Sequence, residues 1–275
     1  MPDTYKQQVM QWRAARDATL RAENGWLALA GLFWLKEGDN IVGSDPASDI
    51  LLPARAPGSL GIFVLDGRRV TFEITPGHAV KVNQQDVEQE MLLRADTDDA
   101  PSYITLDTLR MVVIERPNGI GIRLWDNLRP ERRIYPSREW FPINEKFRLP
   151  ARYFHYPTPK KVLLPDTFGE MREDTMDGQV TFELDGNMFD LDATEQEHGR
   201  LYIQFRDRTS GTETYPTGRY YYTLDALADG KITLDFNFSY SPPCAFTDYA
   251  TCLFAPEQNF INTRIEAGEY YHSHD

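Results

Sequence analysis

The spacing of apolar residues changes along the chain and predicts one helix followed by many short strands. Tyr5, Val9 and Trp12 recur at helical spacing among charged residues, which predicts an amphipathic helix over residues 1–25. Beyond it, alternating runs such as GIFVL, VTFEIT and RMVVIER are separated by turn sequences, a pattern typical of antiparallel β-structure. We therefore expect a mainly β protein with an N-terminal helix.

The pattern breaks between residues 129 and 161, where proline and arginine replace the alternation. We take this segment as a connector between two domains, a β-sandwich over residues 26–128 and a second antiparallel β-sandwich or small barrel over residues 162–275. Within the second domain, the pair Asp185-Gly186 is typical of a two-residue hairpin turn.

Composition and charge narrow the classes of partner. The chain has 275 residues, 41% of them apolar and 26% charged, which is the balance of a folded globular protein. Its net charge of −13 disfavours nucleic acid and anionic membrane surfaces as partners. The connector is an exception with nine basic and three acidic residues. It either attracts an anionic ligand or pairs with the acidic surfaces on both sides.

The most apolar run, WLALAGLFWL at residues 26–35, is too short to span a bilayer. We interpret it as core rather than as a signal peptide, because acidic residues precede it and no small-residue cleavage site follows. The expected compartment is the cytoplasm, where Cys244 and Cys252 would be thiols more often than a disulfide.

The first β domain resembles a known interaction fold. The stretches GDNIVGSDPASDILLP (38–53), VKVNQQDV (80–87) and ITLDTLRMVVIE (104–115) resemble the forkhead-associated β-sandwich in order and spacing. Members of that family bind phosphothreonine, but Ser44 stands here in place of their arginine and only Val82-Asn83 remains of their turn. The resemblance implies a scaffold that docks a protein partner without a phosphate.

The second domain carries longer motifs. RDRTSGTETYPTGRYYY (206–222), DFNFSYSPPCAFTDYATCLFAPEQNF (235–260) and IEAGEYY (265–271) are similar to DUF1684, a bacterial and archaeal family of unknown function. Further matching segments extend the resemblance over nearly the whole chain, and it implies no activity. The chain departs from the family at Leu253, where a proline is usual, and at residues 258–260, where Asn-Arg-Leu is usual.

Polar residues at predicted strand ends supply the candidate site. Paired guanidinium groups suit a small polar or anionic ligand, since arginine presents a planar fork to carboxylate or phosphate. The alternative is that these residues form structural ion pairs. Our catalytic candidates are Cys244, Asp235 and Asp207, and our ligand-binding candidates are Arg206, Glu213, Tyr215, Arg219, Asn237 and Asn259.

The two cysteines allow three interpretations. They are buried thiols or a disulfide that fastens the loop, or Cys244 is a nucleophile or redox group, or they bind a metal together with the tail that holds His272 and His274. Two cysteines and five histidines are few for a zinc site, so we expect no metal and no cofactor.

Two functions from different classes follow from the sequence. The first is a small-molecule site in the second β domain, which binds its ligand with or without catalysis. The second is a protein-interaction module built on the first β domain.

Overall fold

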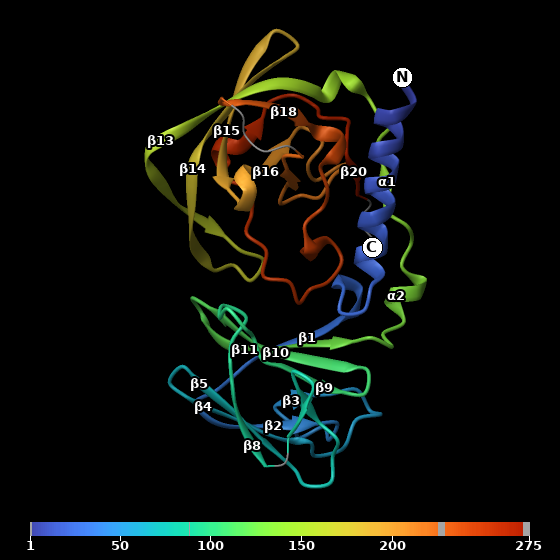
Figure 1. Ribbon diagram of the computed structural model, residues 1–275, viewed down its shortest axis with the longest axis vertical. Coiled ribbons are helices and arrows are strands. Elements are labelled where there is room, and N and C mark those ends of the chain that lie inside the picture. The colour runs from blue at the N-terminus through green and yellow to red at the C-terminus, as the bar shows by residue number, and fades with distance from the viewer. Residues whose placement is uncertain (1, 88, 225–228, 272–275) are drawn as a thin grey trace. The chain divides into compact units, whose positions relative to one another are not determined.

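The chain divides into two compact units in the computed structural model, which describes residues 2–87, 89–224 and 229–271. The half-barrel unit comprises Met1–Thr19 and Pro136–Asp275, and the sandwich unit comprises Leu20–Tyr135. Strands dominate both units (Figure 1), so the predicted fold class is confirmed. Among the described helices, none is long and apolar enough to cross a membrane.

The sandwich unit consists of two sheets in its described residues. The first has the order β1-β11-β10-β9-β6-β7, with β1 Leu29–Trp34, β11 Gly119–Asp126, β10 Leu109–Arg116, β9 Tyr103–Leu106, β6 Lys81–Val82 and β7 Gln85–Asp86. The second has the order β3-β2-β4-β5-β8, with β3 Ile50–Leu51, β2 Gly38–Gly43, β4 Gly61–Asp66, β5 Arg69–Ile74 and β8 Glu90–Leu93. The 3-10 helix η1 (Trp26–Ala28) precedes β1, and α2 (Glu131–Ile134) follows β11.

The sandwich core lies between these sheets. Alternate residues of β4 and β5 are buried, as the period-2 pattern of the sequence predicts, and Phe63 packs on Phe72 with ring centroids 4.9 Å apart. Leu27 and Leu29, from the apolar run at residues 26–35, are buried as well. That run therefore contributes core, as expected.

The half-barrel unit combines the helix α1 (Pro2–Arg21) with a curled sheet of order β17-β16-β15-β14-β13-β18, to which β19 adds through β16. Its strands are β13 Arg148–Pro165, β14 Met171–Leu184, β15 Asn187–Glu195, β16 Leu201–Asp207, β17 Arg219–Tyr222, β18 Lys231–Asp235 and β19 Phe260–Ile261. A separate pair joins β12 (Glu139–Trp140) to β20 (Glu269–Tyr270). The 3-10 helices are η2 Glu145–Phe147, η3 Glu197–Gly199, η4 Phe236–Phe238, η5 Pro243–Ala245 and η6 Glu257–Asn259.

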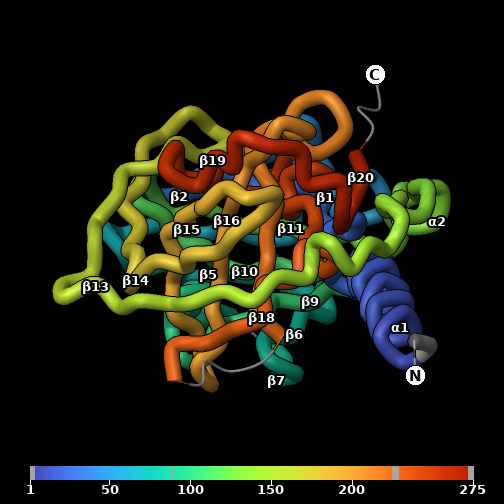
Figure 2. The backbone as a smooth tube through the Cα atoms, turned by 90° about the horizontal axis from the view of Figure 1, so that it is seen from above, coloured from blue at the N-terminus to red at the C-terminus, as the bar shows by residue number. Residues whose placement is uncertain are grey.

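The hairpin of β13 and β14 is the longest element of the sheet. Figure 2 shows β13 as an extended run that turns back as β14. Part of β13 lies in the segment that the sequence pattern predicts to be a connector. The register of β13 with β14 breaks there between His155 and Lys160, around Pro157 and Pro159. Proline has no N–H to donate to a neighbouring strand and therefore hides the strand pattern.

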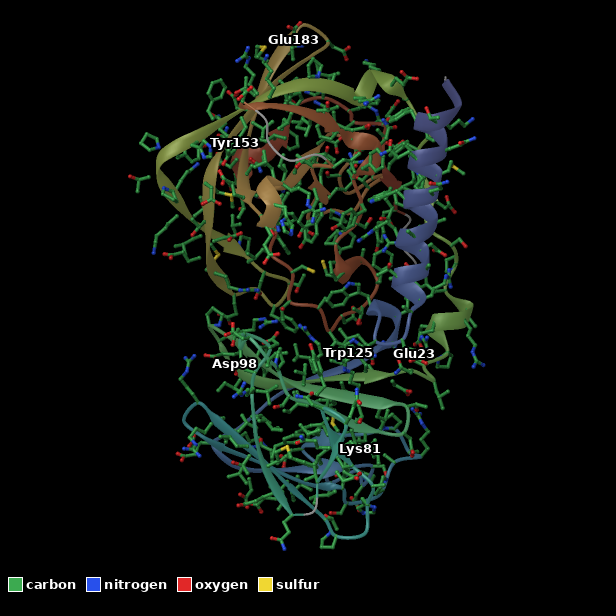
Figure 3. The ribbon with its side chains drawn as sticks, viewed as in Figure 1. Glu23, Lys81, Asp98, Trp125, Tyr153 and Glu183 are labelled. Carbon is green, nitrogen blue, oxygen red and sulfur yellow. The ribbon has the colours of Figure 1, made fainter. Side chains whose placement is uncertain are left out.

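The turn between β14 and β15 matches its prediction. Asp185 and Gly186 have φ angles of 52° and 75°, and Leu184 pairs with Asn187 on either side of them. Glu183, labelled in Figure 3, stands just before this turn. Two consecutive positive φ angles define the tight hairpin turn that Asp-Gly favours.

Helix α1 packs against the half-barrel core with the apolar face that its sequence predicts. Val9 is fully buried there, and Tyr5 and Trp12 pack beside it. The Arg13 guanidinium donates through Nη1 to the carbonyl of Phe141 at 3.1 Å. The first 19 residues therefore belong structurally with residues 136–275.

Many basic residues of the 129–161 segment form ion pairs within their own unit. The carboxylates that they contact are spread over several elements of the fold. The pairs are Arg129–Glu131, Arg138–Glu269, Lys146–Asp185, Arg148–Asp235, Lys160–Asp192 and Lys161–Glu173. This pairing accounts for much of the positive charge that the sequence concentrates there.

Candidate functional site

A groove of about 590 Å³ lies beside the end of β16, and we call it the Arg206 groove. Arg206 and Asp207 end this strand, where alternation turns consecutive side chains to opposite faces of the sheet. Arg206 is half-buried and lines the groove, whereas Asp207 is buried. The full lining is Lys160, Val162, Leu163, Leu164, Pro165, Met171, Asp192, Arg206, Phe254, Ala255, Pro256, Glu257 and Gln258.

The Arg206 side chain forms no ion pair or hydrogen bond within the described residues. Its Nε is shielded from solvent and has no acceptor there. A donor that is shielded from solvent and has no hydrogen-bond acceptor lowers the stability of the folded protein. A guanidinium group beside an acceptor avoids this loss of stability. Arg206 is therefore the cation of the groove whose hydrogen-bonding capacity is unused within the described part of the chain.

Asp192 lies in the groove with its charge already compensated. Its carboxylate is 1% exposed, accepts a hydrogen bond from Tyr156 Oη at 2.5 Å and pairs with Lys160 Nζ at 2.8 Å. Burial, followed by this hydrogen bond, raises the pKa of Tyr156 well above its ordinary value of 10.0. Tyr156 therefore stays protonated and acts as a donor at neutral pH.

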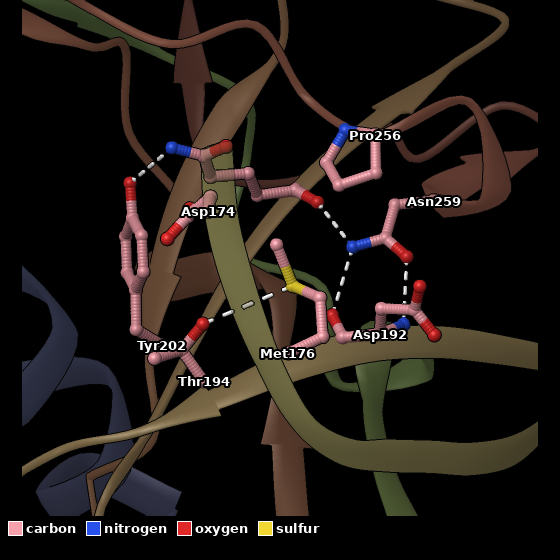
Figure 4. Close-up of a pocket in the computed structure, with 8 residues that line it drawn as sticks. Asp174, Met176, Asp192, Thr194, Tyr202, Pro256 and Asn259 are labelled. Atoms are coloured by element: carbon pink, nitrogen blue, oxygen red, sulfur yellow. Dashed lines mark hydrogen bonds between the residues drawn. The ribbon is translucent and has the colours of Figure 1, made fainter. Parts of the chain in front are cut away.

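Asn259, from η6, fastens the floor of this region (Figure 4). Its Nδ2 donates to the carbonyls of Asp192 (2.8 Å) and Gln204 (2.7 Å), and its Oδ1 accepts from the Asp192 N–H at 2.7 Å. The side-chain amide thus bridges β15 and β16 where their own pairing has ended. Asn259 holds the adjacent 254–258 segment in place and has no donor left for a ligand.

A small pocket of about 10 Å³ lies next to Asn259, with room for about one water molecule. Tyr202 Oη accepts a hydrogen bond from Gln204 Nε2 at 2.7 Å, and the Gln204 Oε1 has no donor within the described residues. Asp192 and Pro256 line both this pocket and the Arg206 groove. The small pocket is too small for an organic ligand.

The apolar side of the groove comes from two segments that hold each other. The β13–β14 hairpin supplies Leu163 and Met171, which are 65% and 56% exposed. The 254–256 segment faces it, with the Phe254 N–H donating to the carbonyl of Pro165 at 2.9 Å. The Ala255 N–H in turn donates to the carbonyl of Thr217 at 3.0 Å. These backbone bonds give the groove a fixed apolar wall.

Asp207 and Arg219 form a fully buried ion pair at 3.3 Å instead of lining the groove. The Asp207 carboxylate also accepts from the Ile265 N–H at 2.6 Å and from Thr209 Oγ1 at 2.8 Å. The Arg219 guanidinium donates to the carbonyls of Ile265 and Ala267. This pair therefore fastens the 265–267 segment to β16 and β17.

Asp235 and Asn237 occupy a different cluster, under helix α1. Alternation along residues 231–238 predicts that both side chains share one face of a strand, but this prediction is wrong, because β18 ends at Asp235 and η4 follows. The Asp235 carboxylate caps η4 by accepting from the Asn237 N–H at 3.1 Å, and it accepts from Tyr5 Oη at 2.8 Å. Burial raises the pKa of Asp235 above its ordinary 3.8, although these hydrogen bonds act in the opposite direction.

The remaining candidates belong to the loop regions around the cysteines. Tyr215 Oη donates to the carbonyl of Cys244 at 3.0 Å, and Cys244 and Cys252 are free thiols. Glu213 pairs with Arg264 in an exposed position. The structure thus brings six of the candidates together in pairs (Asp207 with Arg219, Asp235 with Asn237, Tyr215 with Cys244), while Arg206 and Asn259 line two different pockets that share Asp192 and Pro256.

A metal site finds no support in the described part of the chain, where no group of three or more His, Cys, Asp or Glu residues is arranged to hold an ion. His272 and His274 of the tail lie outside the described residues.

Sequence reasoning missed several residues of the groove. Lys160 lies in the predicted connector, and neither Asp192 nor Tyr156, which donates to Asp192 from outside the groove lining, stands out in the sequence. The one available signal is the basic Lys160-Lys161 pair facing the acidic run FDLDA at residues 189–193. Lys160 and Asp192 are brought together by the pairing of β13 with β14 and of β14 with β15. This pairing cannot be predicted from the sequence of any one of these strands.

Comparisons with known proteins support the family resemblance. A family model described as a protein of unknown function (DUF1684) matches residues 134–270. The solution NMR structure of an uncharacterized protein from Haloarcula marismortui is 32% identical, and the match covers 53% of this chain and 82% of that one with a TM-score of 0.43. No curated protein matches the sequence. The family model thus supports membership of the DUF1684 family of proteins of unknown function over residues 134–270.

Proposed function

We propose that the half-barrel unit binds a small organic anion in the Arg206 groove. The observation that carries the proposal is the Arg206 guanidinium, which lines the groove without an ion pair in the described residues. A guanidinium group binds carboxylate or phosphate through two parallel hydrogen bonds, and such charge-assisted bonds are about twice as strong as neutral ones. Arg206 is therefore the anchor for the anionic group.

The apolar wall indicates that the ligand also has an apolar portion. Leu163, Met171 and Phe254 line the groove beside the charged residues. A volume of about 590 Å³ falls within the ~300–1,000 Å³ of small-molecule sites, which are mostly apolar with a few polar groups that fix orientation. A carboxylate or phosphate ester with a short hydrocarbon or ring portion fits this chemistry.

The rim adds a second polar preference. Glu257 and Gln258 are exposed there and supply acceptor oxygens. A carboxylate on the rim repels a second negative charge and accepts from a hydroxyl or amine. The proposal therefore favours a monoanion with a hydrogen-bond donor over a polyanion.

The proposal is for binding and assigns no reaction to the groove. Asp207, Asp235 and Cys244, our catalytic candidates from the sequence, are not among the residues that line it. Arg206 remains a ligand-binding candidate, and Asn259 is a positioning residue for the wall.

The test is isothermal titration calorimetry of the full chain against a panel of acetate, medium-chain carboxylates, hydroxy acids, amino acids and phosphate monoesters. We expect at least one carboxylate or phosphate to bind, and Arg206→Gln to weaken it by roughly 10- to 100-fold, the cost of a charged hydrogen bond. Arg208→Gln is the matched control, because Arg208 is exposed and bonded to Asn262.

Two results would contradict the proposal. One is the absence of binding by every anion in the panel. The other is binding to Arg206→Gln that equals binding to the unchanged protein.

A second candidate function rests on the sandwich unit. We propose that this unit is a forkhead-associated-like scaffold that docks a protein partner without a phosphate. Its described sheets of six and five strands support this proposal, as does a groove of about 360 Å³ lined by Asn83, Tyr103 and Arg110 among others. The Arg110 guanidinium stacks over the Tyr103 ring at 3.7 Å, which makes a flat surface for a peptide.

The two functions separate in a co-purification experiment with the full chain. Docking on the sandwich unit predicts that a partner recovered with the unchanged protein is lost with Arg110→Ala and kept with Arg206→Gln. The reverse pattern would contradict docking there and would tie the partner to the half-barrel unit.

A further inference from the structure

We propose that Cys244 and Cys252 form an oxidation site, in which a peroxide or a small-molecule disulfide converts the two thiols reversibly into an intramolecular disulfide. Both cysteines belong to the loop that follows β18 and η4, and both are free thiols. This site is separate from the lining of the Arg206 groove. The proposal therefore does not depend on ligand binding there.

The two cysteines are in contact. The Cys244 N–H donates to Cys252 Sγ at 3.3 Å. Each thiol also shifts the pKa of the other, so the two side chains lie within interaction distance. A disulfide needs its two cysteines at close approach, and this loop supplies that approach in the reduced state.

Backbone hydrogen bonds hold both cysteines in place. The carbonyl of Cys244 accepts from Tyr215 Oη at 3.0 Å, and the carbonyl of Cys252 accepts from the Thr167 N–H at 3.0 Å. Thr167 Oγ1 also donates to the carbonyl of Ala250 at 2.7 Å. The entropy of closing the loop is thus already lost in the folded reduced protein, which raises the effective concentration of one thiol at the other.

The two thiols differ in a way that assigns their order of reaction. Cys244 is partly exposed, whereas Cys252 is 6% exposed. The hydrogen bond from Cys252 lowers the pKa of Cys244, and the same bond together with burial raises the pKa of Cys252. Because the thiolate is the nucleophile, Cys244 attacks the oxidant and Cys252 resolves the product.

The chemistry balances with hydrogen peroxide as the oxidant. The Cys244 thiolate attacks one peroxide oxygen, the O–O bond breaks, and the leaving hydroxide takes a proton to become water, which leaves a sulfenic acid on Cys244. Cys252 then loses its proton and attacks the Cys244 sulfur, and the S–O bond breaks with release of a second water. Two thiols and one peroxide thus yield one disulfide and two water molecules. A small-molecule disulfide oxidant leaves as two thiols instead.

The test uses the full-length reduced protein, equilibrated in glutathione buffers or exposed to hydrogen peroxide, with remaining thiols alkylated before intact mass spectrometry. We expect a monomer that has lost two hydrogen atoms, accepts no alkylating reagent and returns to the dithiol with dithiothreitol. Cys252→Ser should stop at a mixed disulfide of Cys244 with glutathione, while Cys244→Ser should leave Cys252 reduced because that thiol is buried.

The glutathione equilibration, repeated in urea, measures how much the folded structure contributes to disulfide formation. We expect the effective concentration of the thiol pair to fall at least tenfold in the unfolded chain, since the unfolded loop must pay its closure entropy. Two alkylatable thiols in the native protein, under buffers that oxidise dithiothreitol completely, would overturn the proposal. The proposal would also be overturned if the effective concentration of the thiol pair were equal in native and unfolded protein, or if disulfides formed only between chains.

Discussion

Arg206 and Asp207 are neighbours on β16, yet strand alternation gives them opposite surroundings. Arg206 faces the groove without an ion pair in the described residues, and Asp207 is buried against Arg219. Two adjacent charged residues therefore supply one group that lines the groove and one group that is structural. Their different costs on mutation follow from this difference in burial.

Asp207→Asn should destabilise the half-barrel unit strongly. The change leaves the Arg219 guanidinium buried without its counter-charge, and breaking one side of a buried pair typically costs about 3–5 kcal/mol. Urea unfolding followed by circular dichroism measures the loss. Glu213→Gln is the control, because its partner Arg264 is exposed and the loss should be much smaller. Equal losses in the two variants would show that the buried pair has no special role.

The loss of stability that Asp235→Asn causes, relative to the unchanged protein, should become smaller as the pH rises above about 4. The folded state raises the pKa of Asp235 above 3.8, so the folded state holds the proton more tightly than the unfolded chain does. In the pH interval between the two pKa values the unchanged protein therefore loses stability as pH increases, whereas the amide variant does not titrate.

Melting temperatures of both proteins between about pH 4 and pH 7 measure this difference. The expected result is a gap between them that narrows with increasing pH. A gap that widens would mean that the hydrogen bonds from Tyr5 and Asn237 outweigh burial and lower the pKa.

Among the elements, α1 depends most on residues far away in the sequence. Its apolar side contacts the half-barrel core, in which Val9 is fully buried while the next residue, Met10, is 54% exposed. The helix is therefore stabilised by packing rather than by its own propensity alone.

Val9→Ala should destabilise the half-barrel unit by about 2 kcal/mol, because two buried methyl groups and the space they fill are lost. Met10→Ala is the matched control and should have little effect, since Met10 is exposed. Chemical unfolding gives both values. Equal effects of the two substitutions would contradict the packing of this face of α1.

The periodicity of apolar residues and the residue types at turns predict the helix and the regular strands from the sequence. The helix and the Asp185-Gly186 hairpin lie where apolar spacing and the turn pair indicate. The sequence pattern fails where tertiary contacts override it. Prolines hide part of β13, and β18 stops at Asp235 because that side chain caps η4 instead of continuing the strand.

The candidate site is less predictable, because residue type does not report burial. Arg206 and Arg219 look alike in the sequence, but only Arg206 lines the groove. The strand pairings that bring Lys160 and Asp192 together join segments that show no shared motif. Chemistry at strand ends could thus be anticipated, but the grouping of side chains could not.

At the scale of the whole molecule, the described residues form two hydrophobic cores with no member in common. One core joins Val9 to residues 147–267, and the other lies within residues 42–124. Each unit therefore has the means to resist unfolding on its own.

Phe72→Leu should weaken the sandwich unit alone. Native-state hydrogen exchange read by mass spectrometry should accelerate in residues 29–126 and stay unchanged in residues 148–261. A loss of about 1.4 kcal/mol speeds exchange through global opening roughly tenfold. The α1 amides should follow the half-barrel unit, which contains residues 2–19. Acceleration in both units would contradict their independence.

The membership of α1 in the half-barrel unit has a consequence for synthesis on the ribosome. The helix is translated before its core partners, which extend to Ala267. At about 5–20 residues per second, its apolar face waits tens of seconds while the intervening sandwich emerges and folds. The nascent chain therefore exposes an amphipathic segment until those partners have been synthesised. A chaperone that shields this segment would have the most to contribute before the last core partners, up to Ala267, are synthesised.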